Sequence, residues 1–143
     1  MTGSDYLRRI RVLDAEIANL NAEINDLYGI RAAAGYDVPK VNGSGIAADQ
    51  TAETAVKIIT LETKRDRLLS EWIDLYRTVS DLLELLPDVL QRIVLVSRYV
   101  LGQKWEDVAK DAGYSTKNTF RIHKKALQEF EKLWKGTANT RDQ

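Results

Sequence analysis

The stretch WEDVAKDAGYSTKNTFRIHKKAL, residues 105–127, holds the side chains best suited to chemistry with a charged partner. From Ala112 to Gln128 the chain contains several bases and no acid, although as a whole it has 21 Lys and Arg against 21 Asp and Glu. Lysine and arginine neutralise phosphates, and arginine can also form paired hydrogen bonds with guanine. The stretch therefore predicts a local surface for double-stranded DNA within a chain of zero net charge.

The residues around this stretch have the spacing of a helix-turn-helix. Gly113 can adopt the left-handed backbone conformation that a tight turn needs, and Ser115 is a good N-cap for the helix that follows. The spacing predicts one helix that starts near Lys104 or Trp105 and a second helix that starts at Thr116.

Helical periodicity separates the inner and outer faces of these two helices. The predicted inner set is small or apolar, with one threonine where valine or isoleucine would be usual: Val108, Ala109, Ala112, Tyr114, Thr119 and Ile122. With a period of 3.6 residues, the polar and basic side chains then point outward. The predicted DNA-binding set is Ser115, Thr116, Lys117, Asn118, Phe120, Arg121, Lys124 and Lys125.

The outer set has the chemistry of a major-groove reader. Asn118 can pair with adenine, and the hydroxyl groups of Ser115 and Thr116 can bond to bases or phosphates. Phe120 is an unusual outward aromatic residue, for which contact with a thymine methyl group would account. The alternative is that the lysines form only a solvated helix face. The absence of acids and the turn spacing favour DNA binding.

Residues for catalysis and metal binding are scarce. The chain has a single histidine, His123, and no cysteine. It also lacks a glycine-rich phosphate loop and a carboxylate set framed by a pocket. We therefore expect no metal, no cofactor and no enzyme activity. We expect His123 to be a half-buried packing residue.

Two runs of apolar residues with alternating steps of three and four precede this block. The first is Ile10, Leu13, Ile17, Leu20, Ile24 and Leu27; the second is Ile58, Leu61, Arg65, Leu68, Trp72, Leu75, Val79, Leu82 and Leu86. Heptad spacing gives each helix a single apolar stripe. The pattern predicts an all-α fold in which the two runs pair as an antiparallel hairpin coiled coil. We interpret Arg65, inside the second stripe, as a device that fixes register or oligomeric state.

Capping residues set the predicted helix starts. The first helix is capped by Ser4 or Asp5, and the second by Asp49 or Thr51. Segment 29–49 contains several glycines and is predicted to be a flexible connector between the two helices.

Glycine and proline set the predicted ends of the helices. Gly29 ends the first helix and Pro87 ends the second. Pro87 also suits the first position of a new helix, which Gly102 ends. The predicted domains are a helical hairpin over 1–86, a helix-turn-helix domain of three to four helices over 87–135, and a disordered tail over 136–143.

The second helix is longer than the first, so its partner cannot cover all of its stripe. The part from Trp72 to Leu86 must meet either the C-terminal block or a second chain. We expect a homodimer through this long helix, with two DNA half-sites related by the two-fold axis of the protein.

The chain carries no signal for secretion or membrane insertion. Its N-terminus lacks the apolar core of a signal peptide, and no segment could span a bilayer. The lack of cysteine fits a reducing compartment. We therefore expect a cytoplasmic protein with no membrane partner.

The C-terminal third resembles the fourth conserved region of bacterial sigma factors. The matching residues are Leu86-Pro87, Arg98-Tyr99, Gly102, Glu106 to Ala109, Gly113 to Ser115, and Lys125 to Leu127. The whole chain is similar to phage-encoded sigma-like regulators of the ArpU type, which place a heptad hairpin before such a domain. Ala55 to Glu62, AVKIITLE, matches the start of their second helix.

This resemblance implies a late-gene transcription regulator of a phage or prophage in a Gram-positive host. The clustered aromatic and basic residues with which sigma factors melt promoters are missing, so the chain would recruit or redirect host RNA polymerase from upstream DNA. Two alternatives remain open. One is a terminase small subunit that binds packaging sites, although in those proteins the helix-turn-helix comes first. The other is a coiled-coil protein that binds a host factor.

Overall fold

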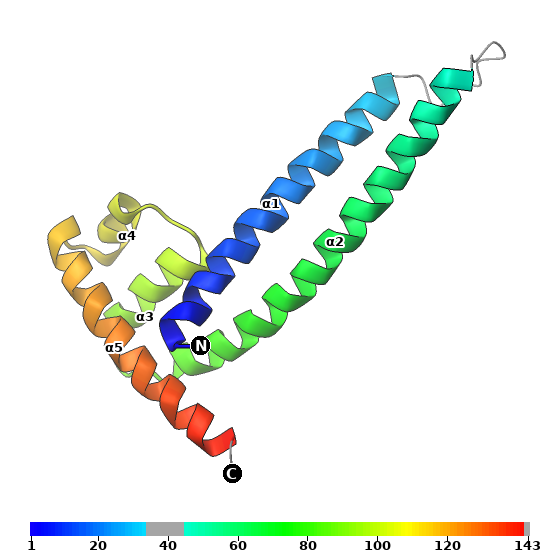
Figure 1. Cartoon of the computed structure of the whole chain (residues 1–143). Coiled ribbons are helices and arrows are strands. Elements are labelled where there is room, and N and C mark those ends of the chain that lie inside the picture. Colours follow the sequence, from blue (N-terminus) through cyan, green and yellow to red (C-terminus); the bar gives the residue numbers. More distant parts are fainter. Residues whose placement is uncertain (34–44, 142–143) are drawn as a thin grey trace. The chain divides into compact units, whose positions relative to one another are not determined.

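The computed structural model describes residues 1–33 and 45–141, and almost all of this part is helical (Figure 1). The elements in chain order are α1 (Gly3–Ala33), α2 (Gly45–Glu84), α3 (Val89–Leu95), η1 (Val96–Val100), α4 (Trp105–Ala112) and α5 (Thr116–Arg141). η1 is a single turn of π-helix that continues α3. The residues described contain no β-strand, so the predicted all-α class is confirmed.

The chain divides into two compact units, and the division differs from the predicted boundary at residue 86. One unit combines Met1–Leu13 with Trp72–Gln143, and the other is Asp14–Glu71. The physical reason is that the first turns of α1 and the last turns of α2 share a hydrophobic core with α5. We call these the core unit and the paired-helix unit.

In the paired-helix unit, α1 and α2 run side by side in opposite directions (Figure 1). Leucine and isoleucine of both predicted stripes are buried here, among them Leu20, Ile24 and Ile58. Arg65 interrupts the stripe with a polar contact, because its Nη1 donates to Asn21 Oδ1 at 3.3 Å on the facing helix. Arg65 also pairs with acids of its own helix. These contacts are compatible with a register role for Arg65.

The core unit is built around apolar residues from α1, α2, α3 and α5. Its buried members are Leu7, Ile10, Val79, Leu82, Leu83, Leu86, Leu95, Ala126 and Phe130. Trp72 and Leu75 pack against this cluster. The C-terminal block and the first turns of α1 therefore cover the α2 stripe from Trp72 to Leu86, which leaves little of it for a second chain.

The start of α1 is capped by Thr2, and not by Ser4 or Asp5 as predicted. The backbone N–H of Asp5 donates to Thr2 Oγ1 at 3.1 Å, and the N–H of Thr2 donates to Asp5 Oδ2 at 2.8 Å. This reciprocal pair is a capping box, in which Thr2 is the N-cap and Asp5 is the acidic residue three positions later. Ser4 lies inside the helix. The backbone N–H of Thr2, followed by its hydroxyl group, lowers the pKa of the Asp5 carboxyl group.

The predicted connector 29–49 is helical at both of its ends. α1 continues through Gly29 to Ala33, and α2 starts at Gly45, so Asp49 and Thr51 lie inside a helix instead of capping it. A glycine costs an exposed helix only about 1 kcal/mol relative to alanine. Next to Gly29, the hydroxyl group of Tyr28 donates to Glu62 Oε1 at 3.0 Å and ties α1 to α2. Residues 34–44 of the predicted connector lie outside the described residues.

The predicted disordered tail 136–143 is also helical over most of its length. α5 continues to Arg141, past Gly136. The hydroxyl group of Thr137 donates to the carbonyl oxygen of Leu133 at 3.0 Å, one turn earlier. An existing helix extends at low cost, because each further residue adds one backbone hydrogen bond. Residues 142–143 lie outside the described part of the chain.

Pro87 precedes α3 instead of starting it. Asp88 is the N-cap, and its Oδ1 accepts from the N–H groups of Leu90 at 2.9 Å and Gln91 at 3.2 Å. A side-chain cap of this kind satisfies two donors that a helix start leaves open, which places the first turn at Val89.

Gly102 ends the α3–η1 segment, as predicted. It has a φ of 69°, in the left-handed region. The guanidinium group of Arg11 lies so close to its backbone that an added Cβ would come within 2.5 Å of Nη1. The left-handed backbone therefore favours glycine at this position, and a side chain there would also displace the end of the flexible Arg11 side chain. No helix in the described ranges is long and apolar enough to cross a membrane.

Candidate nucleic-acid interface

The turn between α4 and α5 consists of three residues, Gly113 to Ser115. Gly113 ends α4 with a φ of 78°, and its N–H bonds to the carbonyl oxygen of Ala109 at 3.0 Å. Ser115 begins α5, because its Oγ accepts from the N–H of Asn118 at 3.2 Å. The turn thus has a left-handed glycine at one end and a serine cap at the other, as the sequence predicts.

The inner side of the two helices is closely filled. Val108 and Ala109 of α4 are buried, and so are Thr119 and Ala126 of α5. Thr119 is completely buried, and its hydroxyl group donates to the carbonyl oxygen of Ser115 at 2.8 Å. The threonine can therefore replace the usual valine or isoleucine, because its methyl group packs while its hydroxyl group is satisfied within its own helix.

Tyr114 is not the inner anchor that the sequence predicts. Its side chain is 45% exposed. The N–H of Tyr114 bonds back to the carbonyl oxygen of Ala109 at 3.1 Å, as part of the cap of α4. The space between the helices is already filled by Val108, Ala109 and Thr119, so the ring lies outside. The predicted inner residues Ala112 and Ile122 are partly buried.

The outer face of α5 carries the predicted DNA-binding set. All eight side chains are exposed: Ser115, Thr116, Lys117, Asn118, Phe120, Arg121, Lys124 and Lys125. Within the described residues, none of the four bases forms a salt bridge. Their charges are therefore available to a partner. The oxygen of Ser115 is already used as a helix cap, which leaves its hydroxyl hydrogen as the group for donation.

Phe120 packs against a second aromatic side chain, a contact that the sequence does not predict. Its ring is 46% exposed and packs edge-on against Trp105, with ring centroids 4.8 Å apart. Trp105 is the first residue of α4. The aromatic pair therefore connects the start of α4 to the outer face of α5, and it holds the Phe120 ring in a fixed direction.

His123 of α5 is half-buried within a small aromatic cluster that also includes Trp105. Its Nε2 is 2.8 Å from the hydroxyl oxygen of Tyr99, and its ring lies edge-on to Trp105 at 4.7 Å. Arg98 stacks over Trp105 at 4.8 Å, and its Nη1 donates to the carbonyl oxygen of Gln103 at 2.9 Å. This cluster braces α5 against η1 and α4. The prediction of a half-buried packing histidine is confirmed.

Burial controls the protonation of this cluster. Desolvation, and to a smaller extent the charge of Arg98, lowers the pKa of His123. Desolvation also raises the pKa of the Tyr99 hydroxyl group. Both groups are therefore neutral near pH 7, and the hydrogen bond between them is one between uncharged partners.

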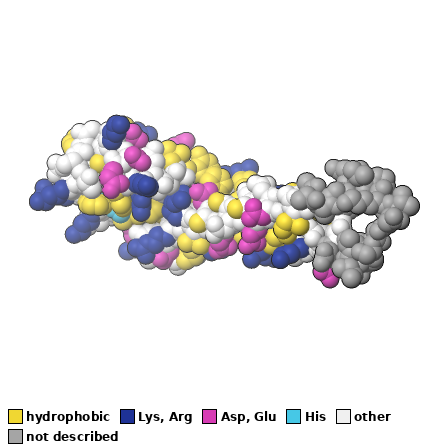
Figure 2. Space-filling view, turned by 90° about the horizontal axis from the view of Figure 1, so that it is seen from above, with side chains coloured by type: hydrophobic (Ala, Val, Ile, Leu, Met, Phe, Trp, Pro, Cys, Tyr) yellow, Lys and Arg dark blue, Asp and Glu magenta, His cyan; other side chains and the backbone are white. Residues whose placement is uncertain are grey.

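Acids on this part of the surface come from α4 rather than from α5. Figure 2 shows Lys and Arg side chains in dark blue, with Asp and Glu in magenta among them, over the region of α4 and the start of α5. Glu106, Asp107 and Asp111 of α4 are all exposed. The basic face of α5 is therefore narrow and bounded by the exposed acids of α4.

The residues described contain no group of three or more His, Cys, Asp or Glu that could hold a metal ion. Comparison of the chain with protein-family models, curated proteins and solved structures gives no match.

Proposed function

We propose that the chain binds double-stranded DNA sequence-specifically, with α4, the Gly113 turn and α5 acting as a helix-turn-helix and α5 as the recognition helix. One observation carries this proposal. The eight polar, basic and aromatic side chains from Ser115 to Lys125 are exposed on one helix half without an acid, while the inner residues of that half pack against α4.

The chemistry of the exposed set is suited to a major groove. Arg121, Lys124 and Lys125 would neutralise phosphates or bind guanine, and Asn118 would pair with adenine. Phe120, held by Trp105, would contact a thymine methyl group. The positive end of the α5 dipole lies at the same end of the helix and favours a phosphate there.

The biological role that fits this chemistry is transcription regulation without catalysis. The resemblance to the fourth region of sigma factors and to ArpU-type regulators supports a phage or prophage protein. We propose that it acts in the cytoplasm of the host bacterium, at late-gene promoters, and that it recruits or redirects host RNA polymerase there.

The test is selection of DNA from the genome that encodes the chain. Purified protein is mixed with fragments of that genome at a low and a moderate salt concentration, and retained fragments are sequenced. We expect retention of a fragment upstream of late genes. Retention of a fragment beside packaging genes, by a ring-sized species, would instead favour the terminase alternative. No retention at low salt would contradict DNA binding.

Two double variants make the selection specific to the proposed face. Arg121→Ala with Lys124→Ala removes two charges from the first half of α5, and retention should be lost. Lys132→Ala with Lys135→Ala removes two charges from exposed positions in its second half, and retention should persist. Equal loss of DNA retention in both variants would mean that binding depends only on the total charge of the chain. That result would exclude α5 as the recognition helix.

A further inference from the structure

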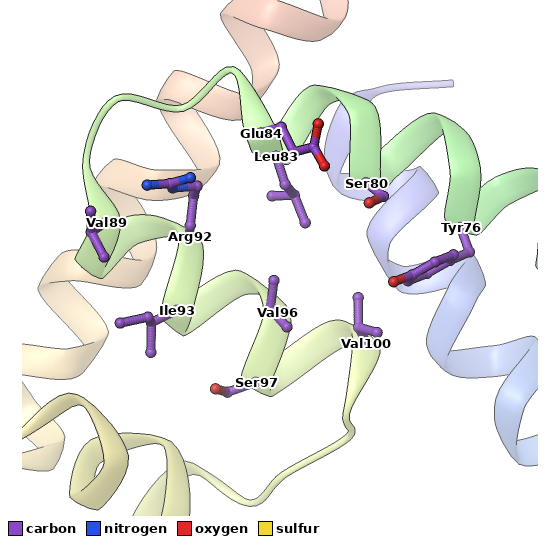
Figure 3. A pocket seen from close by; sticks show the side chains of 10 residues that line it. All are labelled: Tyr76, Ser80, Leu83, Glu84, Val89, Arg92, Ile93, Val96, Ser97 and Val100. Atoms are coloured by element: carbon purple, nitrogen blue, oxygen red, sulfur yellow. The ribbon is translucent and has the colours of Figure 1, made fainter.

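A second surface of the core unit has features of a binding site that the DNA proposal does not use. An apolar groove of about 500 Å³ lies between the last turns of α2 and the α3–η1 segment (Figure 3). Tyr76, Ser80 and Leu83 line it from α2, and Ile93, Val96 and Val100 line it from the other side. Figure 3 shows Leu83, Val96 and Val100 around the same open space.

The groove is walled by two stripes that the long heptad seam does not include. On α2, Tyr76, Ser80 and Leu83 follow at steps of four and three. Val89, Ile93, Val96 and Val100 follow at steps of four, three and four. Alternating steps of this kind form the seam of helix–helix contacts.

Apolar side chains at the edges of the groove are exposed to solvent. Val89 is 56% exposed, and Tyr76 is 38% exposed. The α2 stripe that packs in the core, by contrast, contains the fully buried Val79. Apolar side chains that gather around a groove, instead of being scattered singly, mark an interaction surface.

Two opposite charges on the groove lack partners. Glu84 of α2 and Arg92 of α3 both line it, and within the described residues neither forms a salt bridge. Nε of Arg92 is buried and has no hydrogen-bond acceptor. A buried donor without an acceptor is unfavourable, because it has lost its hydrogen bonds to water. The guanidinium group therefore lacks a carboxylate, and a carboxylate without a partner is present on the same surface.

We propose that this groove binds a second copy of the chain through a two-fold symmetric contact. A two-fold axis brings a surface against itself, so the surface must carry both members of each complementary pair. Here Glu84 of one copy would face Arg92 of the other, twice, and the exposed Tyr76 and Val89 would pack into the opposite groove. The balance of one acid and one base favours self-association over a strongly charged partner.

This proposal does not depend on DNA binding, but it has a consequence for it. A dimer carries the outer face of α5 twice and doubles the number of phosphates it neutralises. The surface also differs from the one predicted from sequence, because the seam of α2 is occupied by its own chain whereas the groove is open.

The first test is the mass of the full chain in solution by sedimentation equilibrium. We expect a dimer for the wild type. Val89→Glu should raise the dimer dissociation constant at least about tenfold and leave the far-ultraviolet circular dichroism spectrum of the folded chain unchanged, because Val89 is the exposed first residue of α3 and an acid is favoured there. A wild type that is monomeric at all accessible concentrations would overturn the proposal, as would a Val89→Glu variant that dimerises normally.

The second test uses charge reversal in two separate chains. Glu84→Arg alone and Arg92→Glu alone each place like charges opposite each other, so each should weaken the homodimer on the order of tenfold or more. An equimolar mixture of the two variants restores opposite charges across both contacts and should form a heterodimer. In the mixture each chain keeps its own single substitution. Restored association therefore cannot be explained by a change in the folding of either variant. Failure of the mixture to associate would overturn the assigned pairing.

Discussion

The two halves of α5 are parts of one continuous helix with opposite surroundings. In the second half, Phe130 is completely buried, and Glu131 Oε2 accepts from the N–H of Gly3 at 2.6 Å. Trp134 packs its ring on Tyr6 at 4.1 Å and donates to the carbonyl oxygen of Met1. In the first half, the side chains that carry charge have no ion-pair partner within the described residues.

The contrast shows how one helix can separate anchoring from binding. The second half connects α5 to the start of the chain, more than a hundred residues away in sequence, and so fixes the direction of the helix. In the first half, mainly the inner side chains are needed for packing. The charged side chains on its outer face are therefore available to bind a partner. Substitutions in the two halves should therefore affect different measurements.

The largest effect on stability should come from the second half. Phe130→Ala removes a fully buried ring from the core and should lower the free energy of unfolding by about 3 to 5 kcal/mol. The matched control is Phe120→Ala, in which the other phenylalanine loses only an edge contact with Trp105 and the expected loss is about 1 kcal/mol or less. Urea unfolding of both variants checks this. Similar losses in the two would refute the division of α5 into an anchored half and a free half.

A smaller effect should come from the turn that directs the first half. Gly113→Ala forces a side chain into the left-handed region at a φ of 78°, which costs roughly 1 to 2 kcal/mol. An added Cβ meets no atom within 4 Å, so the cost is one of backbone strain alone. Gly113→Asn should cost less, because asparagine tolerates this conformation. Thermal melts of the two variants give the order, and a Gly113→Ala variant as stable as the wild type would contradict this account of the turn.

The smallest effect should be a dependence of stability on pH. Burial lowers the pKa of His123, so the folded chain binds this proton less tightly than the unfolded chain, whose pKa is about 6.5. The contribution is complete above that pH and is lost as the pH falls from about 6.5 toward the lower folded value. His123→Gln should flatten the curve of stability against pH over this range. Urea unfolding at several pH values measures it, and identical curves would exclude a role for this proton.

The first half of α5 was predictable because its signals are local. The positions of Gly113 and Ser115 determine where the helix begins, and the helical period then separates inner from outer residues. Thr119 is buried and all eight predicted contact residues are exposed, as this reasoning requires. Tyr114 was mispredicted because its position depends on how the turn folds back onto Ala109, and hydropathy alone does not report that.

The anchoring of the second half could not be predicted from sequence. The contacts of Glu131 with Gly3 and of Trp134 with Met1 join the two ends of the chain, and no periodicity links such distant residues. The aromatic cluster around Trp105 is a similar case, since it unites residues from three helical segments. Helix ends were also uncertain where a single glycine, such as Gly29, is tolerated inside a helix.

The most direct test of the central claim is the salt dependence of DNA binding. For a fragment retained in the selection, the affinities of the wild type and of the Arg121→Ala, Lys124→Ala double variant are measured over a range of salt concentrations. With about four phosphates neutralised per subunit, the slope of log affinity against log salt should be about −3 to −4 per subunit, and the double variant should reduce it by about 2. An unchanged slope in the double variant would contradict the assignment of the first half of α5 as the DNA-binding surface.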